Sequence, residues 1–70
     1  MPIEKGNIYI LGKRPKDYTK VKVISVKVLN NDRVVVYEDV SDNSTHIAPY
    51  SGFSMWINVK ETEKLEVTSE

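Results

Sequence analysis

A run of ten residues, 20–29, constrains the fold of this chain more than any other segment. Polar and apolar side chains alternate along it, and the apolar ones are mostly valine, which is stiff at χ1 and favours a strand. Val21 and Val23 share one side of such a strand, whereas the apolar residues resume out of phase at Val26. Because a shift of one residue moves every later side chain to the opposite face, we expect a bulge or sharp bend near Ser25.

Strands are predicted in four other segments as well. These are residues 7–11, 33–38, 45–48 and the later part of 59–67. Polar turn residues separate them: residues 12–19 form a long loop, the Asn-Asn-Asp of 30–32 fits a tight hairpin, and 40–44 forms a second turn. The run 33–38 is apolar on both faces, which is typical of a central strand.

A different spacing is found in residues 51–57. Phe53, Trp56 and Ile57 stand at i, i+3 and i+4, the spacing of one helical face. We expect a short helical turn over about residues 52–57. Phe53 and Trp56 should fill the core, because a chain with so few large apolar residues needs both of them there.

The chain has 70 residues and no cysteine, which bounds its organisation. This length is typical of a single domain, so we expect one domain over residues 1–70, with a frayed tail at about 67–70. Without cysteine there is neither a disulfide framework nor a thiolate metal site. No stretch approaches the ~20 apolar residues of a membrane span, and the first residues lack the apolar core of a signal peptide. We therefore expect a cytoplasmic protein without a membrane partner.

The predicted elements follow the order strand, long loop, three-strand meander, helical turn and strand. This order resembles that of an SH3-like small β-barrel, and the resemblance covers nearly the whole chain. It implies an all-β fold, a barrel of about five strands with one short helical turn near residues 52–57. An OB-fold is the alternative, although that fold normally needs a longer chain and a helix between its strands.

The sequence also resembles short barrel-type proteins that are common in bacteria and their phages. Such proteins tend to carry a Gly-x-x-Tyr motif, a bent valine-rich strand, a Val-x-Tyr strand and a Phe-x-x-aromatic turn. The corresponding segments here are Gly6-Asn7-Ile8-Tyr9, Val21 to Val28, Val35-Val36-Tyr37 and Phe53-Ser54-Met55-Trp56. The chain lacks the Ala-Leu-Tyr-Asp-Tyr motif of eukaryotic SH3 domains, the hairpin glycines of KOW motifs and the aromatic strands of cold-shock domains.

Ten basic and ten acidic side chains give the chain no net charge, but the two signs are unevenly distributed. Residues 1–35 carry eight basic and three acidic side chains, a net of +5, and residues 36–70 carry two basic and seven acidic ones, a net of −5. Such a division indicates a dipolar surface, unless the two halves interleave in the fold and neutralise each other. Zero net charge weakens the case for nonspecific nucleic-acid binding, for which a basic domain is expected.

The sequence contains no recognisable catalytic or metal-binding motif. His46 is the only imidazole, and Ser44 and Thr45 are the nearest hydroxyls, but on a strand Thr45 points to the face opposite His46. The acidic residues of 38–42 lack the spacing of a calcium loop and fit a solvated turn. We therefore predict that the protein is not an enzyme and uses no cofactor or metal.

Basic and aromatic side chains gather in the loop that follows the first strand and continue onto the next strand. The candidate binding residues are Lys13, Arg14, Lys16, Tyr18, Lys20 and Tyr50. We expect a non-enzymatic binding module whose partner is a protein, contacted through the 13–20 loop and the Tyr50–Trp56 segment, such as a phage or bacterial regulator or inhibitor of a cellular protein. The alternative is a nucleic-acid-binding barrel in which the same loop contacts phosphates and Tyr18 stacks on a base. An exposed strand edge also leaves a homodimer open.

Overall fold

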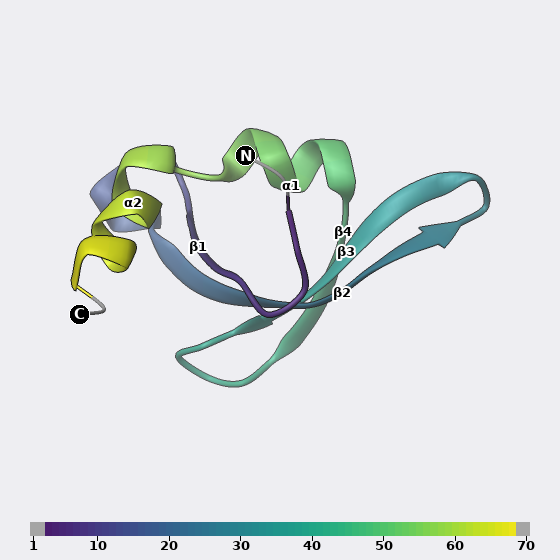
Figure 1. Ribbon diagram of the computed structural model, residues 1–70, viewed down its shortest axis with the longest axis horizontal. Coiled ribbons are helices and arrows are strands. Elements are labelled where there is room, and N and C mark those ends of the chain that lie inside the picture. The colour runs from purple at the N-terminus through teal and green to yellow at the C-terminus, as the bar shows by residue number, and fades with distance from the viewer. Residues whose placement is uncertain (1–2, 69–70) are drawn as a thin grey trace.

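Four antiparallel strands form one sheet, and their spatial order matches their order along the chain. The computed structural model describes residues 3–68, and its strands are β1 (Ile8–Leu11), β2 (Thr19–Leu29), β3 (Asp32–Asp39) and β4 (Thr45–Pro49). A 3₁₀ turn, η1 (Pro15–Asp17), lies between β1 and β2, and two helices follow β4, namely α1 (Tyr50–Trp56) and α2 (Val59–Thr68). Both helices lie on the same side of the sheet, α1 against β3 and β4 and α2 against β1 (Figure 1).

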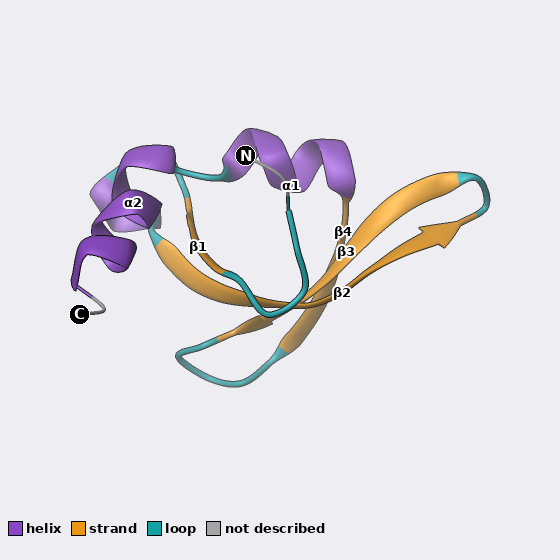
Figure 2. Cartoon of the chain, viewed as in Figure 1, coloured by secondary structure: helices purple, strands orange, loops and turns teal. Residues whose placement is uncertain are grey.

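The prediction of an all-β, SH3-like barrel is wrong. The sheet has four strands and is open, and the two helices make the fold α+β (Figure 2). The difference lies in residues 59–67, which are predicted to end in a closing strand but form most of α2. Without a fifth strand to join them, β1 and β4 stay at the two edges of the sheet. The predicted frayed tail at about 67–70 overlaps α2, which extends to Thr68, and residues 69–70 lie outside the described residues.

Helix α2 forms because its residues support a helix more strongly than a strand. Asn58 precedes the helix, and its Oδ1 accepts a hydrogen bond from the N–H of Glu61 (3.1 Å), as the side chain of an N-cap does. One turn further on, Lys64 Nζ donates a hydrogen bond to Glu61 Oε2 (2.8 Å), which raises the pKa of the Lys64 ammonium. Thr62 is buried and Leu65 is half-buried, at the spacing of one helical face. The strand prediction followed the few apolar residues of this segment and missed the cap.

The bend predicted in the valine-rich strand is confirmed. The register between β2 and β3 shifts between Val23 and Ser25, and the inward-facing positions continue at Val26. A two-residue turn joins the two strands, with φ values of 52° at Asn30 and 69° at Asn31. Asparagine tolerates this left-handed region of φ. A turn with positive φ at both central residues has a backbone twist that matches the twist of the flanking strands. The hairpin extends well beyond the helices (Figure 1).

The core lies between the sheet and α1. Its buried apolar residues are Ile3, Tyr9, Val21, Val23, Val35 and Phe53. The ring centroid of Phe53 lies 6.0 Å from that of Tyr9 and 5.1 Å from that of Tyr37. The helical turn predicted over 52–57 is therefore confirmed, as is the core position of Phe53. Trp56 is 52% exposed, so the prediction that it also fills the core is wrong. It is the last residue of α1 and lies beside the β1–β2 loop instead of over the sheet.

The face of the sheet that points away from the helices forms the outer face, and no element within residues 3–68 covers it (Figure 1). Side chains alternate along β2, and Val21 points into the core, so Lys20 and Lys22 lie on the outer face. Beyond the bulge, the register also places Lys27 there. Ile47 of β4 lies on the same face and is 66% exposed. The outer face is therefore basic along β2 and exposes the apolar Ile47 on β4.

Candidate functional site

A cleft of about 520 Å³ opens between α1, the inner face of the sheet and the β1–β2 loop. The more buried part of its lining is apolar and aromatic and includes Tyr37, Ala48 and Phe53. The exposed part of the lining includes His46 and Trp56. A concave, largely apolar site of this size with a few polar groups is what a bound side chain or small ligand requires.

Three hydrogen bonds hold the start of the β1–β2 loop against the end of α1. The Gly12 N–H donates to the Trp56 carbonyl (2.9 Å), and Asn58 Nδ2 donates to the Gly12 carbonyl (3.2 Å). Lys13 Nζ donates to the Met55 carbonyl (3.0 Å), where its charge also faces the negative end of the helix dipole. The loop wall of the cleft is therefore fixed to the helix wall before any ligand binds.

The turn η1 folds the chain back onto Gly12. The Asp17 N–H donates to the Arg14 carbonyl (2.8 Å), which closes the turn. Gly12 has a φ of +121°, and a Cβ built there would lie only 2.6 Å from the Asp17 carbonyl oxygen. Only glycine permits this close approach of two backbone segments. As a result, Asp17 lines the cleft, while Arg14 reaches it only through an exposed ion pair (Nε to Oδ2 of Asp17, 3.2 Å).

The charged side chains that line the cleft are acidic. Asp17 and Asp39 both line it, and no lysine or arginine of residues 3–68 does. Asp39 Oδ1 accepts hydrogen bonds from the N–H of Ser41 (2.9 Å) and from its hydroxyl (2.7 Å). Within the described residues no ion pair neutralises Asp39, and the exposed Arg14–Asp17 pair is of the weak surface kind. The cleft therefore favours a cationic group over an anionic one.

A chain of hydrogen bonds at the β3–β4 loop joins Asp42, Ser44 and His46. Ser44 Oγ donates to Asp42 Oδ1 (2.6 Å) and lies 2.8 Å from His46 Nε2. Because the hydroxyl has one proton and gives it to Asp42, the network assigns Nε2 of His46 as the donor to Ser44. A serine nucleophile needs the reverse direction, with its proton passed to the imidazole. This chain therefore stabilises the loop, and the hydrogen bonds from the Ser44 side chain and backbone lower the pKa of Asp42.

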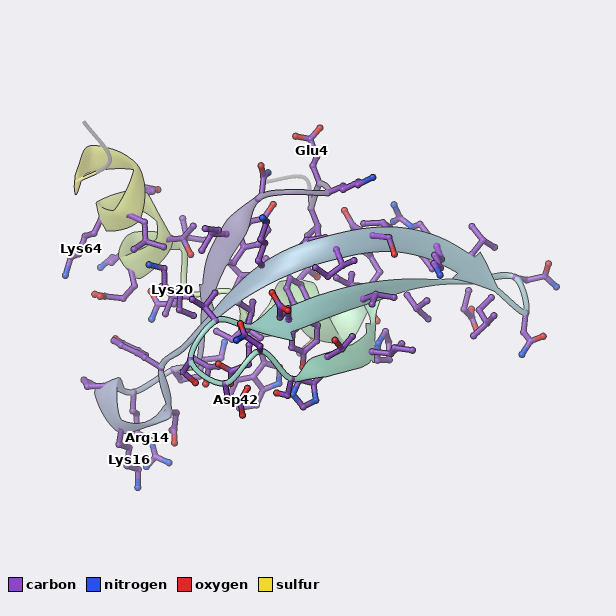
Figure 3. All side chains as sticks on the ribbon, turned by 90° about the horizontal axis from the view of Figure 1, so that it is seen from below. Glu4, Arg14, Lys16, Lys20, Asp42 and Lys64 are labelled. Carbon is purple, nitrogen blue, oxygen red and sulfur yellow. The ribbon has the colours of Figure 1, made fainter. Side chains whose placement is uncertain are left out.

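The candidate residues of the 13–20 loop do not line the cleft. Arg14 and Lys16 project from η1 away from the body of the protein, and Lys20 lies on the outer face (Figure 3). Tyr18 is half-buried, so only part of its ring is accessible to a partner. These residues stay predictions as binding residues, but they do not form a single surface with the cleft.

Tyr50 is separated from the other candidate residues. Its hydroxyl accepts a hydrogen bond from the N–H of Ile3 (3.3 Å), and the Arg33 guanidinium carbon lies 3.9 Å above the centre of its ring. It lines a second depression with Leu29 and Arg33 beside the turn of the β2–β3 hairpin, outside the cleft. Tyr50 thus connects the N-terminal segment, the hairpin and α1, whatever else it binds.

The predicted contact segments 13–20 and Tyr50–Trp56 both contribute to the lining of the cleft, but sequence reasoning missed the lining side chains of β3 and β4. The alternation along strands already places Tyr37 with Asp39, and His46 with Ala48, on common faces. What the sequence did not reveal is that the β1–β2 loop returns to α1 and leaves Trp56 at the rim. That approach depends on contacts between residues more than forty positions apart.

Comparison of the chain with protein-family models, with curated proteins and with solved structures found no match. No helix among residues 3–68 is both long and apolar enough to cross a bilayer. The same residues do not bring three or more histidine or acidic side chains together as a metal site requires. The function is therefore argued from the cleft and its surroundings.

Proposed function

We propose that this protein is a non-enzymatic binding module for a protein partner and that the cleft between α1 and the β1–β2 loop is its contact site. The observation that carries the proposal is the fixed geometry of the cleft, whose loop wall is held at Gly12 by a backbone hydrogen bond to Trp56 and by a hydrogen bond from the Asn58 side chain. A site held in place before binding loses less conformational entropy when a partner arrives. Trp56, half-exposed at the rim, is of the residue type that most often anchors protein interfaces.

The charge of the cleft supports a protein ligand over a nucleic acid. Asp17 and Asp39 line the cleft and would repel phosphate groups. The basic residues Arg14 and Lys16 project from η1, outside the cleft, where they are positioned to steer or orient an acidic region of a partner (Figure 3). The protein then presents an acidic cleft with basic side chains outside it, an arrangement that the division of charge between residues 1–35 and 36–70 does not describe, because Asp17 lies in the basic half.

A second candidate function uses the outer face. The register aligns Lys20, Lys22 and Lys27 along β2 on a face that no helix covers, and such a row can follow a phosphate backbone. Among these lysines only Lys22 has an acidic residue, Glu38, as its partner in the strand register. Tyr18 is half-buried, so nucleic-acid binding of this kind would rest mainly on charge.

The test of the proposed function is a selection of peptide ligands. A library of random peptides displayed on phage or yeast is panned against the wild-type chain, and enriched peptides are measured by fluorescence anisotropy. Trp56→Ala removes the rim side chain while leaving the backbone carbonyl that accepts the Gly12 N–H. Met55→Ala is the matched control, because Met55 belongs to the same helix, is 71% exposed and does not line the cleft.

We expect enriched peptides that bind the wild type and Met55→Ala equally and Trp56→Ala at least about tenfold more weakly. The proposal would be refuted if no peptide is enriched, or if the enriched peptides bind Trp56→Ala as tightly as the wild type. The outer-face alternative is measured with a fluorescent single-stranded oligonucleotide at low and moderate salt. Steep salt dependence that is lost in Lys22→Gln/Lys27→Gln would establish it, and no binding at low salt would eliminate it. The proposal includes a cytoplasmic location, which cell fractionation tests.

A further inference from the structure

The outward edge of β4 carries unpaired backbone groups. In an antiparallel pair, the residues of an edge strand direct their N–H and C=O groups alternately toward the neighbouring strand and away from it. The Asp39 N–H donates to the Ser44 carbonyl (2.9 Å), which fixes this alternation along β4. Thr45 and Ile47 are therefore the residues whose N–H and C=O groups point away from the sheet. Pro49 is two residues further on, so its backbone also faces away from β3. Proline has no N–H, and none is needed at this position for pairing with β3.

Within residues 3–68 no strand or helix pairs with this edge of the sheet, because β4 is its last strand. Ile47 is 66% exposed. A short, open edge with two outward N–H groups is the feature to which extended peptides add in many recognition domains. The edge therefore fits an extended segment of a partner protein.

The cleft begins at this same edge. His46 and Ala48 alternate along β4 with Thr45 and Ile47, and both line the cleft. A peptide strand paired with β4 would direct every second side chain over the inner face of the sheet, toward the cleft. Since neighbouring strands lie about 4.8 Å apart, such a side chain starts roughly 10 Å from β3, and only a long one spans the cleft.

The lining of the cleft selects the chemistry of that side chain. Trp56, which is half-exposed, and the partly buried Tyr37 line the cleft with aromatic surface, which binds the apolar stem of lysine or arginine and attracts its cation. Asp39 adds a carboxylate that no ion pair of the described residues neutralises. We propose that an extended peptide pairs with the free edge of β4 and inserts a lysine or arginine side chain into the cleft. The inference rests on the proposed function, because it names the ligand class of the same cleft.

The test uses synthetic peptides of strand-forming composition and measures quenching or shift of Trp56 fluorescence, since Trp56 is the single tryptophan of the chain. The parent peptide is acetyl-Thr-Val-Lys-Val-Thr-amide, and its central lysine is replaced in turn by arginine, norleucine and glutamate. We expect the lysine and arginine peptides to bind, the norleucine peptide to bind about tenfold more weakly, and the glutamate peptide not to bind. Higher salt should weaken the two basic peptides only.

Two variants separate the cleft from the edge. Asp39→Asn removes the charge but keeps an oxygen that accepts the hydrogen bonds from Ser41, and it should weaken the lysine peptide about fivefold or more. Ile47→Pro removes an outward N–H while leaving the pairing with β3, and it should weaken every peptide alike. Ile47→Thr is the control, because it keeps the N–H, and it should bind as the wild type does.

The outcomes distinguish this inference from the proposed function. If peptides selected by display need Trp56 but contain no basic residue, or bind Asp39→Asn and Ile47→Pro as well as the wild type, the inference is wrong and the proposed function stands. If no displayed or synthetic peptide binds, both are wrong. Self-association that Ile47→Pro abolishes, measured by sedimentation equilibrium, would make a second copy the occupant of the edge and would also overturn the inference.

Discussion

Replacing Gly12 by alanine tests the contact on which the cleft wall depends. At a φ of +121°, alanine is strained, at a cost of about 1–3 kcal/mol. Its Cβ would also lie 2.6 Å from the Asp17 carbonyl oxygen and 2.9 Å from the carbonyl carbon. Both are backbone atoms, which cannot rotate away, so the overlap adds about 1–3 kcal/mol.

The sum, about 2–6 kcal/mol, is large for this chain. A domain of this size has a free energy of unfolding of roughly 4–10 kcal/mol. Since each kcal/mol shifts the melting temperature of such a domain by about 4–8 °C, Gly12→Ala should lower it by at least about 8 °C. The η1 turn would have to move away from β1 to relieve the overlap, which would widen the cleft.

Two other glycines provide matched controls. Gly6 has a φ of +89° but nothing within 4 Å of an added Cβ, so Gly6→Ala should cost only the backbone strain, about 1–3 kcal/mol. Gly52 lies in α1 at an ordinary helical φ with open space around it, so Gly52→Ala should stabilise the helix by about 0.5–1 kcal/mol.

The measurement is guanidinium-induced unfolding followed by far-UV circular dichroism, with all three variants compared in one buffer. The expected order of stability is Gly52→Ala above wild type, then Gly6→Ala, then Gly12→Ala. If Gly12→Ala is as stable as Gly6→Ala, the close approach of η1 to Gly12 is refuted, and with it the fixed loop wall of the cleft.

Three further predictions concern the sheet and its loops. Thr62→Val should lower the free energy of unfolding by about 1–3 kcal/mol in chemical denaturation, because the Ile10 N–H loses its acceptor, Thr62 Oγ1 (3.0 Å), whereas Thr62→Ser should cost less. Val35→Ala should cost about 2–4 kcal/mol in the same assay, because this side chain is fully buried. Ser44→Ala should raise the lowered pKa of Asp42 toward its usual 3.8, as followed by carboxyl NMR titration. Because that pKa is depressed in the folded state, the stability it contributes is present above about pH 4 and is lost as the pH falls through the folded value, and Ser44→Ala should weaken this acid dependence.

The parts of the fold that are determined by residues close together in the sequence could be predicted. The out-of-phase valines required a bulge near Ser25, and the Asn-Asn pair after Leu29 required a tight turn. The spacing of Phe53 and its neighbours required a helical turn. The segment after Asn58 was different, because its few apolar residues fit a strand or a helix, and the helix is favoured by the Asn58 cap and by the long-range hydrogen bond from Ile10 to the buried Thr62.

The candidate site was less predictable because it depends on long-range contacts. A cluster of basic residues in a loop indicates a binding surface, but Lys13 of this loop donates a hydrogen bond to the Met55 carbonyl near the end of α1. Tyr50, grouped with the same loop in the sequence prediction, instead connects Ile3 and Arg33. Trp56 was assigned to the core on residue type, although its position at the end of α1 leaves it at the rim of the cleft.

The contacts that join β1 to the last part of the chain also order the events of biosynthesis. The N–H of Ile10 is satisfied by Thr62, and Leu11 forms a bridge with Ile57, so β1 is completed by residues made about fifty positions later. The meander of β2, β3 and β4 closes short loops, which loses less chain entropy than joining residues fifty positions apart. The cleft, by contrast, cannot exist on a nascent chain until Asn58 has emerged to bond Gly12. When the chain folds from its N-terminus, the cleft is therefore completed after the meander.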